Sequence, residues 1–190
     1  EKSSQKKVGM DVYLVRKDLL EYLVDDAMAH GKYNFVTDVL IKNLKHLKIY
    51  GYKHSGYVSR LSSAASYQQL NMDFLKPEVQ DDLFCKERPI YTKVKDGAPA
   101  KYGSEAQVKN SLIGSGCIIE GEVENSVLFR GVYVGKGAKI KNSIVMQDSR
   151  IYENTSLDQV IVDKRVNVRP YSNLVGSQEY PLIIPKGAVV

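Results

Sequence analysis

Residues 122–174 read EVENSVLFRGVYVGKGAKIKNSIVMQDSRIYENTSLDQVIVDKRVNVRPYSNL and decide the fold of the second half of the chain. Aliphatic residues recur in this stretch in three columns, and each column advances by 17 residues. Successive columns are separated by five, six and six residues. The columns are Val123, Ile140, Leu157 and Leu174; Leu128, Val145 and Val162; and Val134, Ile151 and Val168.

A repeat of about six residues with one aliphatic position is typical of a triangular parallel β-helix, in which three repeats complete one turn. A second marker keeps the same spacing, because Asn125-Ser126 recurs as Asn142-Ser143, and Asn110-Ser111 lies 15 residues before the first pair. We therefore predict an all-β hexapeptide-repeat β-helix over residues 105–190. So few coils bury little apolar surface relative to the entropy lost on folding, so we expect them to dock on the first half and to join an oligomer.

The first half of the chain shows helical spacing instead. Apolar residues recur every three or four positions in three stretches, which predicts three helices. These stretches are residues 16–30, 36–47 and 63–75. Gly31 suits the C-cap of the first helix, Asn34 or Thr37 suits the start of the second, and Pro77 is expected to end the third.

Two segments of the first half predict strands. The β-rich run 8–15 is expected to be a central strand, and the tyrosine-rich stretch 47–58 is expected to be strand and turn. Residues 1–76 therefore predict an α/β domain with too few strands to be complete. Residues 77–104, rich in proline, glycine and charge, predict a linker.

Composition excludes several classes of function. The hydrophobic content of 43% and the charged content of 26% are those of globular proteins, and we expect a cytoplasmic protein because neither a membrane span nor a leader is visible. The net charge of +5 is scattered among acids, so we predict preference for small phosphorylated ligands rather than nucleic acid. Cys85 and Cys117 lack the spacing of a disulfide framework or a zinc site and are expected to be small, buried or half-buried side chains.

An ordered set of motifs along nearly the whole chain resembles bacterial glucose-1-phosphate adenylyltransferase (ADP-glucose pyrophosphorylase). The motifs are Ser66-Tyr67; Asn71, Asp73 and Leu75; Arg88-Pro89-Ile90; Pro99-Ala100-Lys101-Tyr102; and the run from Asn110 to Phe129. The resemblance implies the C-terminal part of a Rossmann-like nucleotidyltransferase domain, a linker and a left-handed β-helix used for allostery and oligomerisation. The implied reaction joins ATP and glucose 1-phosphate into ADP-glucose and pyrophosphate, in glycogen biosynthesis.

Two departures from the family pattern fall where the resemblance places the sugar and metal site. Catalytic members carry a stretch like Tyr-Trp-x-Asp-Val-Gly-Thr, whose aspartate binds magnesium, and this chain has Val58 for the tryptophan and Arg60 for the aspartate. A guanidinium does not coordinate magnesium, although it suits a phosphate; an exposed arginine without a role is the alternative. Upstream, Asp11 replaces a glycine and Val15 replaces an aromatic residue.

These departures resemble the regulatory subunits that partner a catalytic subunit. We therefore predict a regulatory subunit with little activity, none in this part of it alone, and no cofactor bound here, with magnesium serving the holoenzyme. By aligned position, Arg88, Lys101 and Lys164 are candidates to bind a phosphorylated effector. Arg130, Arg165 and Arg169 are further cations on predicted coil turns, and the alternative for each is a solvated charge at a coil corner.

Two other readings compete with the regulatory subunit. Acyltransferases with hexapeptide β-helices use a histidine as general base, and β-helical carbonic anhydrases bind zinc with three histidines. The three histidines of this chain, His30, His46 and His54, all precede the predicted coils, which disfavours both enzymes. An assembly scaffold without a ligand stays open as an alternative.

Overall fold

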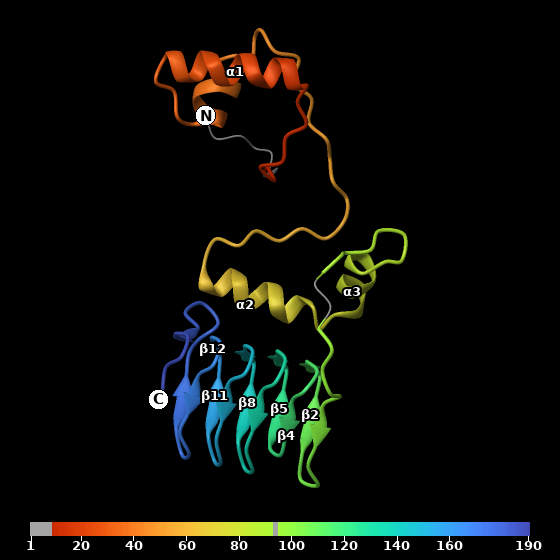
Figure 1. The fold of residues 1–190 in the computed structure, drawn as a ribbon, viewed down its shortest axis with the longest axis vertical. Coiled ribbons are helices and arrows are strands. Elements are labelled where there is room, and N and C mark those ends of the chain that lie inside the picture. Colours follow the sequence, from red (N-terminus) through yellow and green to blue (C-terminus); the bar gives the residue numbers. More distant parts are fainter. Residues whose placement is uncertain (1–8, 93–94) are drawn as a thin grey trace. The chain divides into compact units, whose positions relative to one another are not determined.

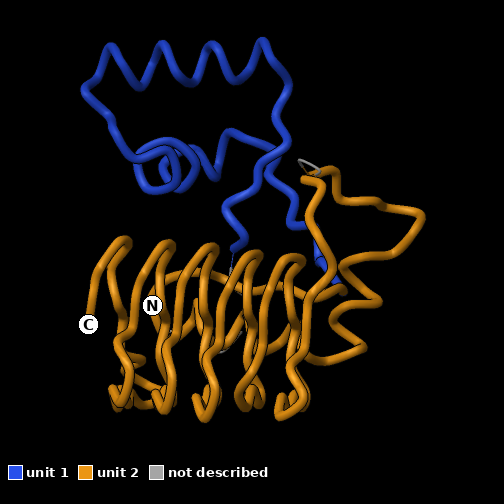
Figure 2. Tube along the Cα trace, turned by 60° about the horizontal axis from the view of Figure 1, so that its bottom comes forward, with its two compact units in different colours: residues 1–55 blue, residues 56–190 orange. Residues whose placement is uncertain are grey.

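The structure is a computed structural model that describes residues 9–92 and 95–190. The chain forms two compact units, residues 1–55 and residues 56–190 (Figure 2). The predicted domain boundary lay at residue 76. Residues 56–76 instead group with the coils, because they pack on them, as described below.

The second unit is a parallel β-solenoid, which confirms the predicted β-helix (Figure 1). In the described part of the chain, fifteen short strands form three five-stranded parallel sheets, and each sheet takes every third strand. The first sheet, A, contains β1 (Lys101–Tyr102), β4 (Ile118–Ile119), β7 (Tyr133–Val134), β10 (Arg150–Ile151) and β13 (Asn167–Val168). Sheet B contains β2 (Gln107–Lys109), β5 (Glu122–Glu124), β8 (Lys139–Lys141), β11 (Ser156–Asp158) and β14 (Asn173–Val175). Sheet C contains β3 (Leu112–Ile113), β6 (Val127–Leu128), β9 (Ile144–Val145), β12 (Val160–Val162) and β15 (Leu182–Ile184).

The three predicted aliphatic columns are the interior of the solenoid. Val123, Ile140, Leu157 and Leu174 are register partners along sheet B. The other two columns pair in the same way along sheets C and A. All of these side chains are buried except Leu174, which is partly buried in the last coil. Stacking of identical positions therefore builds the core, as the 17-residue period predicted.

The distance in sequence from Asn110 to Asn125 is 15 residues rather than 17, and this difference has a local cause. One corner of the second coil consists of Glu120 and Gly121 alone, where later coils use four residues between the same strands. The chain is so close to the next coil here that a Cβ on Gly121 would lie 2.4 Å from the carbonyl oxygen of Ala138. Only glycine fits a corner that is two residues shorter.

The Asn-Ser marker is the corner between sheets B and C. Each asparagine has a positive φ, between 44° and 46°. The serine after it points inward and accepts a hydrogen bond from a backbone N–H of the following coil: Ser126 N–H to Ser111 Oγ, Ser143 N–H to Ser126 Oγ, and Val160 N–H to Ser143 Oγ, each at 3.1 Å. A serine ladder thus satisfies buried backbone donors where the sheet hydrogen bonds are interrupted.

The outward face of sheet C is apolar and covered by the helix α2 (Ala64–Asp73). Ile144 points outward, because Val145 beside it points inward, yet Ile144 is fully buried. Gln68 of α2 donates to the carbonyl oxygen of Asn142 at 2.6 Å and to Oε1 of Gln159 at 2.7 Å, at the corner before β9 and β12. Figure 1 shows α2 running across the coils. The predicted docking of the coils on part of the first half is confirmed for this helix.

The third predicted helix ends before Pro77, as expected, at Asp73. The predicted linker is nevertheless wrong in two respects. Pro77 is also the first residue of a new helix, α3 (Pro77–Leu83), a position where its missing N–H costs nothing. The solenoid also begins at β1, residue 101, rather than at residue 105. The start of the predicted linker is therefore helical and its last residues form the first strand.

The first unit is small and helical. It contains α1 (Lys17–Ala29), as predicted, with Gly31 in the left-handed conformation just after it. The second predicted helix is a π-helix, η1 (Phe35–Leu40), capped by the Asn34 side chain and followed by turns. Leu23 of α1 and Val39 of η1 are its buried apolar residues.

Both strands predicted for the first half are wrong. Residues 9–15 and 47–58 contain no strand in the structure, and residue 8 lies outside the described residues. A β-rich sequence becomes a strand only when a neighbouring strand pairs with it, and residues 9–92 offer none. The helices alone therefore give the predicted nucleotidyltransferase-like fragment weak support.

Candidate functional site

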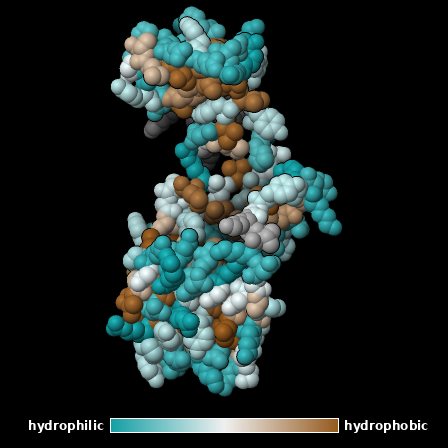
Figure 3. Space-filling view, in the orientation of Figure 1, coloured by the Kyte–Doolittle hydropathy of each residue, from teal (hydrophilic) through white to brown (hydrophobic). Residues whose placement is uncertain are grey.

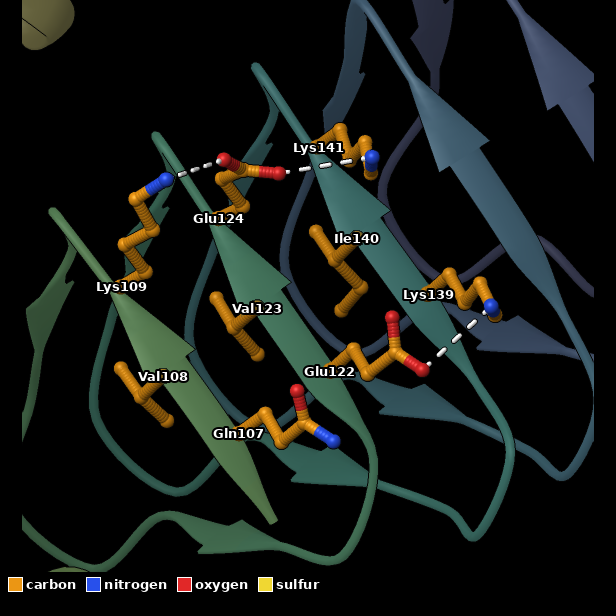
Figure 4. A pocket seen from close by; sticks show the side chains of 9 residues that line it. All are labelled: Gln107, Val108, Lys109, Glu122, Val123, Glu124, Lys139, Ile140 and Lys141. Atoms are coloured by element: carbon orange, nitrogen blue, oxygen red, sulfur yellow. Dashed lines mark ion pairs between the residues drawn. The ribbon is translucent and has the colours of Figure 1, made fainter.

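Nine residues of β2, β5 and β8 in sheet B line an open pocket, and five of them are charged (Figure 4). Glu124 lies between Lys109 and Lys141, at 3.4 Å from each, and Lys139 lies 3.3 Å from Glu122. Hydrogen bonds from Lys109 and Lys141 lower the pKa of Glu124. These ion pairs are solvent-exposed and contribute little energy, and the three lysines and two glutamates leave a net charge of only +1. We do not assign a ligand site to this pocket.

The outer face of sheet A carries an aromatic cluster. The Tyr133 hydroxyl donates to Glu120 at 3.0 Å, and its ring meets that of Tyr152 edge to face at a centroid distance of 6.2 Å. Burial and the carboxylates of Glu120 and Glu153 raise the pKa of Tyr133 to about 12. The hydroxyl therefore stays protonated and acts as a donor throughout the physiological range.

Val58 and Arg60 lie on a short segment that is pinned to α2 and α3. Tyr57 donates its backbone N–H to Asp82 Oδ2 at 2.6 Å and its hydroxyl to Asp73 Oδ2 at 2.9 Å. Burial and the bond to Asp73 raise the pKa of Tyr57. Both Val58 and Arg60 are exposed in the second unit. The segment that resembles the family's sugar and metal stretch is thus physically attached to the helices on the solenoid.

Asp11 and Val15 belong to the first unit and Val58 and Arg60 to the second. Asp11 has a φ of 55°, which suits the glycine that catalytic relatives are expected to have at this position, and aspartate is among the few other residues that tolerate it. Tyr13 donates to the Asp11 side chain at 3.4 Å. A degenerate sugar site made of these four residues stays a prediction.

The three predicted effector residues do not gather at one place within the solenoid. Lys101 is in β1, and its register partner at the far edge of sheet A is Asn167 in β13. Four strand spacings of about 4.8 Å separate these two positions by roughly 19 Å. Lys164 lies in the corner that leads into β13, so it is far from Lys101. Arg88 lies beside α3, where its guanidinium is 3.6 Å from Asp82 Oδ1.

The further cations lie at coil corners, as predicted. Backbone bonds between coils stack Arg130, Gln147 and Lys164 at the corner between sheets C and A, and Arg165 has a φ of 58° there. Arg169 lies at the next corner, where its carbonyl oxygen accepts from Thr155. All four cations are exposed. Cys85 is half-buried and Cys117 buried, as expected.

Magnesium does not fit the segment that resembles the metal site. Arg60 occupies the position of the carboxylate, and among the described residues no group of three or more His, Cys, Asp or Glu side chains could hold a metal ion. No helix in the described part of the chain is long and apolar enough to cross a membrane.

Sequence reasoning missed Tyr57, Gln68 and Asp82, which connect the segment, the helices and the coils. Gln68 and Asp82 are polar residues on short helices, and nothing in their spacing distinguishes them from solvated side chains. Asp73 was singled out only as a member of a family motif, and Arg88 as a motif member and a candidate effector residue, with no indication that Asp73 would hold Tyr57.

Comparison with known proteins places the geometry in context. The family model described as GlmU-like, C-terminal hexapeptide matches residues 98–179. The chain is 41% identical to the glycogen biosynthesis protein GlgD of Bacillus subtilis (strain 168) and 46% identical to that of Geobacillus stearothermophilus, in each case over 95% of this chain and 52% of the relative. It is 34% identical to the glucose-1-phosphate adenylyltransferase of Desulfitobacterium hafniense (strain Y51), over 90% of this chain and 44% of that protein. The chain spans about half the length of the curated relatives it matches.

Proposed function

This chain is a relative of the GlgD glycogen biosynthesis proteins and of glucose-1-phosphate adenylyltransferases, and we propose that it is part of a regulatory subunit of such an adenylyltransferase. The proposed subunit associates with a catalytic subunit and changes its response to effectors, while forming little or no ADP-glucose itself. Because ATP and glucose 1-phosphate are cellular metabolites, the cytoplasm is the expected compartment.

Two observations together support this proposal: the chain is more similar to the GlgD proteins than to the adenylyltransferase, and two residues of its site segment differ from the catalytic pattern. Identity to the two GlgD proteins, 41% and 46%, exceeds the 34% to the Desulfitobacterium adenylyltransferase. Arg60 and Val58 stand where the catalytic pattern has an aspartate and a tryptophan. Phosphoryl transfer relies on a metal ion to neutralise the phosphates, and a fixed positive charge at that position repels one. Magnesium would then be bound by the catalytic subunit.

The solenoid supports a role in assembly. Residues 188–190 pair with the outer edge of β13, whereas no strand among the described residues pairs with the outer edges of β14 and β15, and open edges are normally paired or covered. We propose that the solenoid contributes to the contact with the catalytic subunit. A phosphorylated effector would use cations such as Arg88, Lys101 and Lys164, singly or across subunits, because they do not share one pocket in this chain.

Hexapeptide acyltransferase activity is not favoured. Residues 101–190 contain no histidine to act as general base, and the relatives named above are glycogen proteins. The regulatory subunit accounts for both the solenoid and the altered site segment.

Co-elution and activity of the full-length subunit test the proposal together. The subunit and its catalytic partner should elute as one complex in light-scattering chromatography, and the complex should respond to activators differently from the partner alone. Pyrophosphate release by the lone subunit should be at background. Separate elution of the two proteins, or no change in activation, would contradict the proposal.

A further inference from the structure

The segment that carries Val58 and Arg60 is fixed at both of its ends. At its start, Tyr57 is bound to α2 and α3. At its end, the N–H groups of Ser62 and Ser63 both donate to Ser66 Oγ at 2.9 Å, in the capping box of α2. Val58 and Arg60 lie exposed between these anchors. Both anchors of the segment therefore lie within the second unit.

Tyr57, Asp73 and Asp82 form what we call the Tyr57 clasp. The hydroxyl of Tyr57 reaches the end of α2 at Asp73, and its N–H reaches α3 at Asp82. Asp73 also accepts hydrogen bonds at its other oxygen, Oδ1, from Gln69 at 3.0 Å and from Lys76 at 2.8 Å, and these favour the same carboxylate orientation. Hydrogen bonds to charged acceptors are stronger than neutral ones, so both bonds of Tyr57 are expected to hold.

Asp82 also has a cationic neighbour, Arg88. Arg88 lies 3.6 Å from Asp82 Oδ1, and its Nη2 donates to the Asp82 carbonyl oxygen at 3.2 Å. The carboxylate that holds the Tyr57 N–H is thus the one that Arg88 orients. One of the predicted effector residues is therefore a single side chain away from the segment of Val58 and Arg60.

The clasp is attached in turn to the coils. Gln68 lies on the same helix as Asp73, is only 4% exposed, and donates to the third and fourth coils through Asn142 and Gln159. Asp163 lies at the opposite end of β12 from Gln159. Burial raises the pKa of Tyr67 in α2, and the charge of Asp163 raises it further, which indicates that the two side chains are near each other. Helix α2 therefore spans the width of sheet C and carries the clasp at its end.

We propose that the Tyr57 clasp makes residues 57–60 move with the solenoid, so that a ligand or partner bound to the coils acts on this segment through α2. Coupling of this kind needs a contiguous set of contacts, and the path from Gln159 through Gln68 and α2 to Asp73 and Tyr57 supplies one. Its consequence for a catalytic partner rests on the proposed function, but the device itself is a property of this chain.

Hydrogen exchange of the full-length subunit, measured by mass spectrometry on the lone protein, tests the device without any partner. Tyr57→Phe should speed exchange of the amides of residues 57–62 roughly tenfold, since it removes a bond to a carboxylate. Asp82→Ala should have at least as large an effect on the Tyr57 amide. Asp81→Ala, one position away on the exposed side of α3, is the matched control and should change exchange less than about twofold. Unchanged exchange in Tyr57→Phe would overturn the proposal.

Gln68→Ala decides whether the coils control the segment. It lies eleven residues from Tyr57 in sequence and does not touch it, yet it should speed exchange at both α2 and the Tyr57 amide by roughly threefold or more. Gln159→Ala, which removes the acceptor on the coil, should act in the same direction if Gln68→Ala folds poorly. Exchange in residues 144–168 reports whether the solenoid itself stays folded. A Tyr57 amide that is unaffected when α2 is loosened in this way overturns the proposal.

A second readout separates this inference from the proposed function. Tyr57→Phe should still co-elute with the catalytic subunit but should change its activation less than the unaltered subunit does. If the unaltered subunit neither co-elutes nor changes activation, the proposed function fails while the exchange data still decide the clasp. If Tyr57→Phe speeds exchange yet leaves activation fully intact, the clasp does not transmit a signal and that part of the proposal is wrong.

Discussion

Asn110, Asn125 and Asn142 hold one corner of the solenoid in a left-handed conformation. Asparagine tolerates this conformation because its short side chain forms local hydrogen bonds, and here Asn110 donates to Asn125 at 2.7 Å and Asn142 donates to Asp158 at 2.9 Å. In the fourth coil Gln159 takes the same place with a φ of 57° and turns its side chain to Gln68. The change from asparagine to glutamine thus gives Gln68 a side-chain acceptor on the fourth coil, in addition to the backbone acceptor of Asn142 on the third.

Val145→Asp tests the aliphatic columns directly. Val145 is fully buried between Leu128 and Val162, so a carboxylate there would have no partner and no water. We expect a loss of stability greater than about 4 kcal/mol, which is enough to unfold the solenoid. Circular dichroism and thermal melting measure this loss.

Val175→Asp is the matched control for that substitution. Val175 lies in β14 and is 61% exposed, so the same carboxylate should cost at most about 0.5 kcal/mol. If the two variants melt within 2 °C of each other, Val145 is not in a packed core and the stacked columns are wrong.

The sequence predicted the solenoid well because its signal is repeated. Each column supplies three or four aliphatic residues at a fixed step, so one misread position does not change the result. Two corners depart from the regular spacing: one at Gly121 is two residues shorter, and one before β15 is longer. Each depends on a glycine that lies very close to the backbone of a neighbouring segment, and the 17-residue period does not predict such a contact. Strands predicted from composition alone, at 8–15 and 47–58, had no repeat to support them and were wrong.

The site was less predictable for a related reason. Val58 and Arg60 could be found by their departure from a family pattern, whereas Tyr57, Gln68 and Asp82 act through contacts between segments 16 to 91 residues apart. Periodicity in the sequence does not predict such long-range contacts. Whether Arg88, Lys101 and Lys164 share a ligand depended on the position of each coil along the solenoid, which only the structure shows.

Helix α2 should be released from Tyr57 in acid. Burial raises the pKa of Asp73, but hydrogen bonds from Lys76, Tyr57 and Gln69 outweigh it, so the pKa lies below its ordinary value of 3.8. A carboxylate with a lowered pKa contributes stability that is complete above 3.8 and is lost as the pH falls through the lowered value. Asp73→Asn should therefore melt a few degrees below the unaltered protein at pH 7, and the difference should shrink below about pH 4.

Asp81→Asn provides the comparison for that pH series. Asp81 is exposed on α3, so the substitution Asp81→Asn should leave the melting temperature unchanged at every pH. A difference between Asp73→Asn and the unaltered protein that stays constant down to pH 3 would show that the charge of Asp73 contributes nothing to the clasp.

The two units differ in how completely they bury their apolar residues. The solenoid has a continuous core, whereas in the first unit Leu20, Val24 and Met28 of α1 are exposed, Met28 to 76%. Apolar side chains are visible on the surface of the helical unit in Figure 3. A helix with an open apolar stripe is normally covered by a neighbour. The relatives are about twice as long as this chain, in keeping with the prediction that residues 1–76 are part of a larger domain.

Arg60→Asp tests how far the segment has departed from a catalytic site. The substitution restores the carboxylate of the family pattern and removes the charge that repels magnesium. We nevertheless expect pyrophosphate release by the full-length variant to stay near background, because Val58, Asp11 and Val15 also differ and residues of one site act as a unit. The unaltered subunit and the catalytic partner, assayed with ATP and glucose 1-phosphate, set the lower and upper limits. Turnover of the variant close to the rate of the partner would mean that Arg60 alone silences the subunit, and turnover by the unaltered subunit at that rate would refute the regulatory assignment.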